Sequence, residues 1–209
     1  MNVAVVCANG RVGQLVVKEA VDRGMEVTAI ARGENKSVAP RFISKDVFDL
    51  TADDLSGFDA VVDAFGAWTP ETIPGIPAAM KHLADLVAGT DTRLLVVGGA
   101  GSLFVNPEHT ATLDMGSDFP EDWKPLSAAH GEGLADLRAR TDVKWTYVSP
   151  AADFQADGPR TGSYILGGEE LTLSEDGVSE VSYADYAIAM VDEIEAGEHV
   201  YERISVVRK

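Results

Sequence analysis

The chain has 209 residues, 45% of them hydrophobic, and a formal net charge of −17. This length favours one domain with a sizeable core over two. A surface this acidic repels phosphate backbones and anionic lipids, so nucleic acid and membranes are not expected as partners. The single cysteine, Cys7, allows no internal disulfide, and the N-terminus has neither a basic region nor a long apolar one. We therefore expect one cytoplasmic domain over residues 1–209.

Short β-branched runs alternate with longer segments of helical periodicity along most of the chain. This alternation predicts an α/β fold, a Rossmann-like, doubly wound parallel sheet with helices on both faces. The expected strands are 3–6, 26–31, 42–43, 58–65, 93–97 and 143–148, and the expected helices are 12–23, 51–56, a segment ending near Gly89, and 127–140.

The pattern changes after Pro150, where short strands are expected at 164–166, 171–173, 178–181 and 204–207, with a helix at 183–196. Residues from about 150 to 209 should therefore form small C-terminal elements on the substrate side. Segment 98–126 is rich in Gly and Pro and has little periodicity, and loops of this length are usually functional or mobile. In sheets of this kind the ligand lies outside the carboxyl ends of the strands.

The turn between the first strand and the first helix has the spacing of a dinucleotide-binding motif. Gly10 would let the backbone approach a pyrophosphate, and Gly13 would let the helix pack closely on the strand. Cys7 stands where such turns have their first glycine. We expect it to be a tolerated small residue with a negative φ; the alternative is a reactive thiol at the helix N-terminus.

The second strand ends at Ala31-Arg32, without the carboxylate that NAD-binding sites use for the ribose 2′-hydroxyl. A guanidinium suits a 2′-phosphate instead, so Arg32 predicts NADP(H) in preference to NAD(H). The alternative is that Arg32 is merely an exposed arginine.

Taken together, several motifs make the chain resemble the atypical short-chain dehydrogenase/reductase group, and within it the NmrA-like NADH-flavin reductases. They lie at 8–13, 94–103, 146–152, 160–162, 166–168 and 181–187. The resemblance implies that Asp46 and Val47 approach the adenine, and that Ser149, Pro150 and Ala151 approach the nicotinamide. It further implies that Phe65, Gly66, Gly98 and Gly99 contact the middle of the cofactor, and that the phosphate turn is formed by Ala8, Asn9, Gly10, Arg11, Val12 and Gly13.

No tyrosine of the chain is followed by a lysine four residues later. Alcohol-oxidising members of the group need that pair for proton transfer, so carbonyl reduction and epimerisation by the usual route are not expected. Transfer of a hydride to a flavin or quinone is less demanding, because the protein mainly has to orient two rings.

Ser102 and His130 could assist such a reaction, or could be a turn hydroxyl and a packing histidine. Trp68 and Trp123 could line an aromatic acceptor's site, or could be loop packing. No metal-ligand spacing is present. The sequence thus predicts an NADPH-dependent reductase of a small flavin- or quinone-like acceptor. A non-catalytic NADP(H)-binding sensor acting through a protein partner, and a sugar-nucleotide epimerase or dehydratase, stay open.

Overall fold

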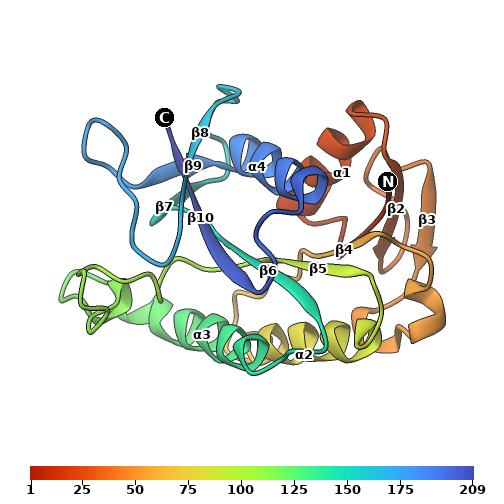
Figure 1. Cartoon of the computed structure of the whole chain (residues 1–209), viewed down its shortest axis with the longest axis horizontal. Coiled ribbons are helices and arrows are strands. Elements are labelled where there is room, and N and C mark those ends of the chain that lie inside the picture. Colours follow the sequence, from red (N-terminus) through yellow and green to blue (C-terminus); the bar gives the residue numbers. More distant parts are fainter.

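An eight-stranded sheet forms the middle layer of the protein in the computed structural model, which describes all residues 1–209 (Figure 1). The strands are parallel except for the last in spatial order, which runs antiparallel at one edge. In that order they are β3 (Arg41–Ser44), β2 (Glu26–Ala31), β1 (Asn2–Val6), β4 (Ala60–Asp63), β5 (Arg93–Val97), β6 (Lys144–Ser149), β10 (Glu202–Arg208) and β8 (Tyr164–Gly167).

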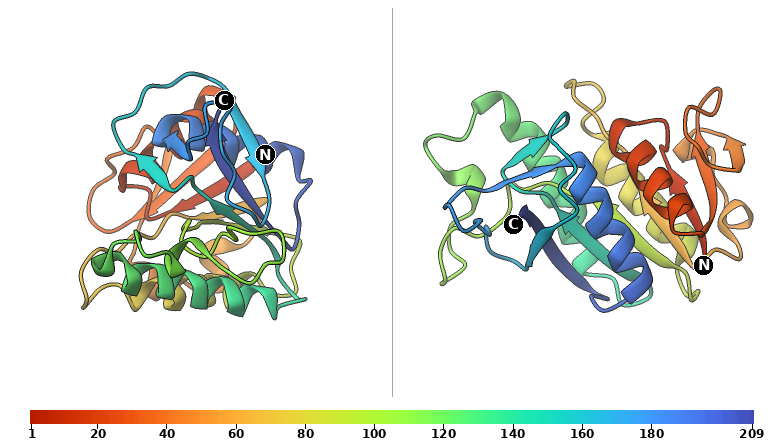
Figure 2. Two further views of the ribbon diagram at one scale, coloured as in Figure 1. Left: turned by 90° about the vertical axis from the view of Figure 1, so that its left-hand side faces the viewer. Right: turned by 90° about the horizontal axis from the view of Figure 1, so that it is seen from above.

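Helices cover both faces of this sheet. Helices α1 (Arg11–Asp22) and α4 (Tyr183–Ala196) pack side by side on one face, as the view from above shows (Figure 2). Helices α2 (Gly75–Val87) and α3 (Lys124–Arg138) pack together on the other. The chain winds from β1 outward to β3 and then crosses to β4 on the other side of β1. The doubly wound, Rossmann-like fold is therefore confirmed, with its switch point between β1 and β4.

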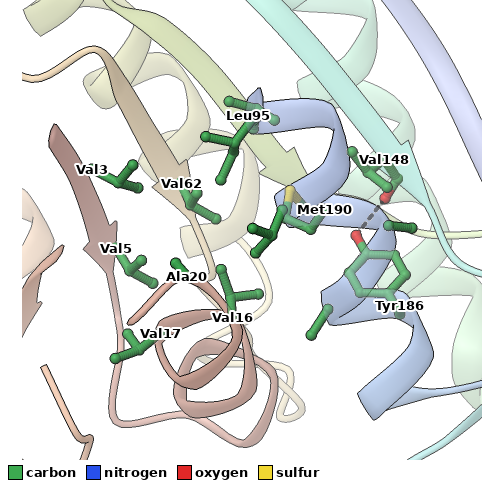
Figure 3. Close-up of a cluster of buried hydrophobic side chains, with 14 of the residues drawn as sticks. Val3, Val5, Val16, Val17, Ala20, Val62, Leu95, Val148, Tyr186 and Met190 are labelled. Atoms are coloured by element: carbon green, nitrogen blue, oxygen red, sulfur yellow. Dashed lines mark hydrogen bonds between the residues drawn. The ribbon is translucent and has the colours of Figure 1, made fainter. Parts of the chain in front are cut away.

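Each face of the sheet has its own hydrophobic core. Under α1 and α4, Val3 and Val5 of β1 and Val62 of β4 contact Val16 and Met190 of the helices (Figure 3). The Tyr186 hydroxyl, although buried in this cluster, donates a hydrogen bond to the carbonyl oxygen of Val148 at 2.7 Å. The inner strands are buried on both faces, which is why they read as continuous apolar runs.

Local signals fix several helix ends. The Ser182 hydroxyl accepts a hydrogen bond from the Asp185 amide at 3.0 Å and begins α4, while Gly197, at φ +64°, ends it. The expected helix at 51–56 is a shorter 3₁₀ helix, Ala52–Leu55, held by reciprocal bonds between Thr51 and Asp54.

The structure corrects several expected boundaries. Helix α3 begins at Lys124 rather than 127, because Pro125 fits the first helical turn, where no amide donor is needed. Residues 171–173 form no strand; Glu170 alone makes a β-bridge, to Phe104. Strands β7 (Asp153–Gln155) and β9 (Glu180–Ser182) form a separate parallel pair, of which only the second was expected.

Segment 98–126 is ordered by contacts rather than by long helices or strands. Phe104 bridges to Thr112 and Glu170, and two single-turn 3₁₀ helices lie at Leu113–Met115 and Glu121–Trp123. The Ser127 hydroxyl donates to the Asp114 carboxylate at 2.6 Å, which fastens the segment to the start of α3.

Candidate functional site

The carboxyl ends of β1, β2, β4, β5 and β6 lie along one edge of the sheet, because these strands are parallel neighbours. The turn after β1 therefore stands beside the loops that follow the other four strands. This edge includes the switch point between β1 and β4, where open α/β sheets bind their ligands.

The turn from Cys7 to Gly13 is shaped as a cradle for an anion. A Cβ added to Gly13 would lie 2.9 Å from the Ala8 Cα and from the Cys7 carbonyl oxygen, so only glycine permits this approach of helix to strand. No side chain caps the N-terminus of α1. Its first amides and the positive end of the helix dipole are therefore available to a phosphate.

Cys7 differs from expectation in its backbone. Its φ is +59°, in the left-handed region that favours glycine, whereas a negative φ was expected. The turn therefore keeps the glycine conformation with a non-glycine residue in it. Burial, with the nearby Asp63 and Asp46 carboxylates, raises the pKa of the Cys7 thiol to about 12. The side chain is thus a thiol rather than a thiolate, which argues against the reactive-thiol alternative.

Asn9 joins the turn to the loop after β2. Its side-chain amide donates to the carbonyl oxygens of Glu34 at 2.8 Å and Arg32 at 3.3 Å, and its side-chain oxygen accepts from the Lys36 amide at 2.9 Å. The Arg32 side chain is 83% exposed, and its Nε lies 3.6 Å from an oxygen of Asp46. Asp46 in turn caps the short helix that begins at Val47. Asn9, Arg32 and Asp46 thus lie close together at the carboxyl end of β2.

Arg11, the first residue of α1, reaches over the turn to the C-terminal part of the chain. Its guanidinium pairs with the exposed Asp157 carboxylate and stands 5.7 Å from the centre of the Tyr183 ring. No pattern in the sequence connects Asp157 with the turn, because it lies 146 positions after Arg11.

At the middle of the edge, β4 ends in a buried carboxyl group. Asp63 is 2% exposed and accepts a hydrogen bond from the Phe65 amide at 3.0 Å, which fixes the start of the loop that carries Phe65 and Gly66. Burial raises the pKa of Asp63 to about 7. Two strands away across β5, the Ser149 side chain at the end of β6 is fully buried, and its hydroxyl oxygen has no protein partner. Pro150 and the buried Ala151 follow directly.

Gly98 and Gly99 lie against two aromatic side chains. A Cβ on Gly98 would stand 2.2 Å from the Tyr147 ring, and one on Gly99 would stand 3.0 Å from the His130 imidazole. The Gly99 amide donates to the Tyr147 hydroxyl at 2.9 Å, and that hydroxyl lies 3.3 Å from His130 Nδ1. Burial lowers the pKa of His130 to about 4, so its imidazole is neutral near pH 7.

The other sequence-predicted residues lie on the segments that follow β4 and β5. The Ser102 hydroxyl oxygen accepts from the buried guanidinium of Arg203 at 3.0 Å, which leaves its own proton free to donate. Trp68 and Trp123 are 75% and 57% exposed, on the loops that lead into α2 and α3. Neither tryptophan packs in a hydrophobic core.

Three residues of this edge were missed by sequence reasoning. Tyr147 was set aside because no lysine lies four residues after it, Asp63 fell within the expected strand 58–65, and Arg203 lay just before the expected strand 204–207. Only a charged residue within an otherwise apolar run, as in 60–63, could have drawn attention to Asp63. No three metal-ligating side chains of the chain gather as a metal site. None of its helices combines the length and the hydrophobicity that crossing a membrane requires.

Comparison with known proteins agrees with this geometry. The chain is 44% identical over 211 residues to the protein YwnB of Bacillus subtilis (strain 168), covering 99% of this chain and 98% of YwnB. It is 54% identical to the crystal structure of a candidate NADH-flavin reductase from Streptococcus pneumoniae TIGR4, with a TM-score of 0.98 over the whole of both chains. It is 35% identical to that of a candidate epimerase from Bacteroides thetaiotaomicron, with a TM-score of 0.86 over 99% of this chain and 96% of the other.

Residues 7–194 match the NAD(P)H-binding family, a range that begins in the turn after β1 and ends within α4. The match includes the whole turn from Cys7 to Gly13 and the ends of β2, β4, β5 and β6. With the two relatives that cover the whole chain at 44% and 54% identity, it shows that this chain belongs to the NAD(P)H-binding family.

Proposed function

We propose that this chain is an NADPH-dependent reductase that transfers a hydride to a flavin- or quinone-like acceptor. The observation that carries the proposal is that the edge combines a dinucleotide cradle with a neutral imidazole and no tyrosine–lysine pair. A site of this kind can orient two rings, but it lacks the proton-transfer pair of the alcohol dehydrogenases.

The choice of NADPH rests on Arg32. Its exposed guanidinium follows β2, where the ribose of a dinucleotide lies in this fold, and no carboxylate occupies that position. The Asp46 carboxylate at 3.6 Å is a loose partner that a 2′-phosphate can replace, because a phosphate offers the guanidinium two oxygens at once.

Each part of the chain has a distinct task in this proposal. The amides at the start of α1 hold the pyrophosphate, and Gly98 and Gly99 let the Tyr147 and His130 rings pack directly against the backbone at the end of β5. The buried Ser149 hydroxyl, which has no protein partner, suits a hydrogen bond to the nicotinamide end. The bound nicotinamide supplies the hydride, and the residues around it keep the acceptor ring stacked and oriented.

The acceptor is expected to be planar and largely neutral. Lys124 is the only lysine or arginine in the loops 66–77 and 98–126, and it is paired with Glu121. A phosphate on the acceptor would need its own cations there. The name of the Streptococcus pneumoniae relative supports a flavin. The Bacteroides thetaiotaomicron relative raises the epimerase alternative, which the missing tyrosine–lysine pair argues against.

A direct test is to follow nicotinamide absorbance when the purified protein is mixed with NADPH or NADH and a panel of riboflavin, FMN and simple quinones. We expect turnover with NADPH and a neutral acceptor, and slower turnover with NADH. Tight NADPH binding without turnover of any acceptor would contradict the reductase and would favour the sensor. Absence of binding would contradict both.

A further inference from the structure

Tyr147 lies beneath the backbone of Gly98 and Gly99 and has no role in the function proposed above. It belongs to β6, and its side chain is fully buried. Its ring occupies the space that a Cβ on Gly98 would need, so the backbone at Gly98 is in direct contact with the ring. The hydroxyl therefore reaches the sheet edge from below, between the ends of β5 and β6.

The hydrogen bonds of this hydroxyl give it a direction. It accepts from the Gly99 amide at 2.9 Å, so its own proton points elsewhere. Two acceptors are within reach: His130 Nδ1 at 3.3 Å and the His130 carbonyl oxygen at 3.5 Å. That carbonyl lies within α3, where the helix ladder gives it a donor, and Nδ1 is both nearer and without another partner.

The direction of this bond determines which nitrogen of His130 carries a proton. A neutral imidazole has one N–H group and one bare nitrogen. Burial lowers the pKa of His130 to about 4, so the ring is neutral near pH 7. If Nδ1 accepts from Tyr147, the proton lies on Nε2, which makes no hydrogen bond to any protein group.

We propose that Tyr147 is a positioning residue that fixes His130 in the Nε2–H form, so that the site offers the acceptor a neutral N–H donor. This inference rests on the proposed function for its chemistry. The Nε2–H group stabilises the negative charge that the acceptor gains with the hydride, and it keeps its own proton. The proton that completes the reduction comes from water. A neutral donor suits this task because it needs no proton transfer of its own in the reacting step.

The variant Tyr147→Phe tests this role, because it keeps the ring against Gly98 and removes only the hydroxyl. Tyr186→Phe is the matched control: Tyr186 is equally buried, but its side chain lies in the core under α1 and α4, and its hydroxyl bonds to the Val148 carbonyl rather than to His130. Long-range ¹H–¹⁵N correlation spectra of histidine-labelled protein report which ring nitrogen is protonated. The chain has four histidines, and His130→Gln assigns the signal.

We expect a bare Nδ1 and a protonated Nε2 at His130 in the wild type and in Tyr186→Phe, and a mixture of the two forms in Tyr147→Phe. With a working acceptor, kcat of Tyr147→Phe should fall about tenfold, as for loss of one hydrogen bond, while the KM and the NADPH Kd change less than twofold. A protonated Nδ1 in the wild type would overturn the proposal, even if Tyr147→Phe failed to fold. So would an unchanged spectrum in a folded Tyr147→Phe. The spectra do not depend on turnover, so they test the Tyr147–His130 interaction even if the proposed reductase activity is not found.

Discussion

The side-chain amide of Asn9 fixes the loop that follows β2, where the adenine end of the cofactor is proposed to lie. Asn9 holds the carbonyl groups of Arg32 and Glu34 and the amide of Lys36, so the backbone after β2 is fixed to the turn after β1. The Arg32 side chain itself stays exposed. The Arg32 backbone is thus ordered before any ligand binds, which lowers the entropy cost of binding a ligand through Arg32.

Arg32→Ala should weaken NADPH binding while leaving NADH binding nearly unchanged. Loss of a charge-assisted contact to the 2′-phosphate costs about 1.5–3 kcal/mol, or roughly 10- to 100-fold in Kd. Titration of both cofactors measures the difference. Arg41→Ala is the matched control. Arg41 is also exposed, but it lies at the amino-terminal end of β3, away from the carboxyl ends that form the site. Equal affinities of the wild type for the two cofactors would contradict the assignment of Arg32.

Cys7 provides a second test at this scale. Its left-handed backbone costs a non-glycine residue about 1–2 kcal/mol. Cys7→Gly and Cys7→Ala both remove the thiol, but only glycine relieves that cost. The glycine variant should therefore unfold at higher denaturant than the alanine variant, by about 1 kcal/mol, and should bind the cofactor at least as well as the wild type. If the two variants were equally stable, the turn would not need a glycine conformation.

At the scale of elements, the sequence predicts best where the determinants are local. The bounds of β2, β5 and α4 agree with the predicted ones, because β-branched runs define the strands and Ser182 begins the helix. Strand β7 was missed because its three residues gain their structure from β9, some 27 positions later. Residues 171–173 have the composition of a strand but find no partner strand.

The site shows the same difference between features set by local sequence and features set by long-range packing. The cradle follows from a local spacing of glycines, so the sequence shows it, although not the positive φ of Cys7. The Tyr147–His130 contact joins β6 to α3, and the Arg11–Asp157 pair joins α1 to a distant loop. Such contacts depend on how the elements pack, which no periodicity records.

The proposed acceptor site lies at the two loops that enter α2 and α3, and their tryptophans test this proposal. Trp68→Ala and Trp123→Ala should each raise the apparent KM for the acceptor several-fold, because a stacked ring loses apolar contact, and should leave the NADPH Kd unchanged. Tyr201→Ala is the control. Tyr201 is 46% exposed and directly precedes β10, so it lies at the amino-terminal end of that strand, away from the carboxyl ends that form the site. An unchanged KM in both tryptophan variants would move the acceptor away from these loops.

For the whole molecule, the buried carboxyl of Asp63 links stability to pH. Its pKa is about 7 in the folded protein and 3.8 without burial, so folding becomes less favourable as pH rises from about 4 through 7. Asp63→Asn keeps a side-chain oxygen for the Phe65 amide and removes the charge. Relative to the wild type, the variant should therefore gain about 3–4 kcal/mol in free energy of unfolding between pH 4 and pH 8.

Denaturant titrations at the two pH values measure this gain. Asp53→Asn is the control, because Asp53 is exposed on the short helix after Thr51. A difference between Asp63→Asn and the wild type that did not change with pH would show that the Asp63 carboxyl has the same pKa in the folded and the unfolded protein, and so would contradict the effect of burial.

The position of β10 has a consequence for the order in which a newly made chain can mature. β10 lies between β6 and β8, although both precede it in the sequence. Until residues 202–208 have been synthesised, β6 exposes an unpaired strand edge, the kind of edge that invites association with other chains. Arg203 of β10 also donates to the carbonyl oxygens of Ser102 and Glu169, so these two segments lack their shared anchor until then. The part of the site that we propose for the acceptor is therefore the last part of the nascent protein to take its final shape.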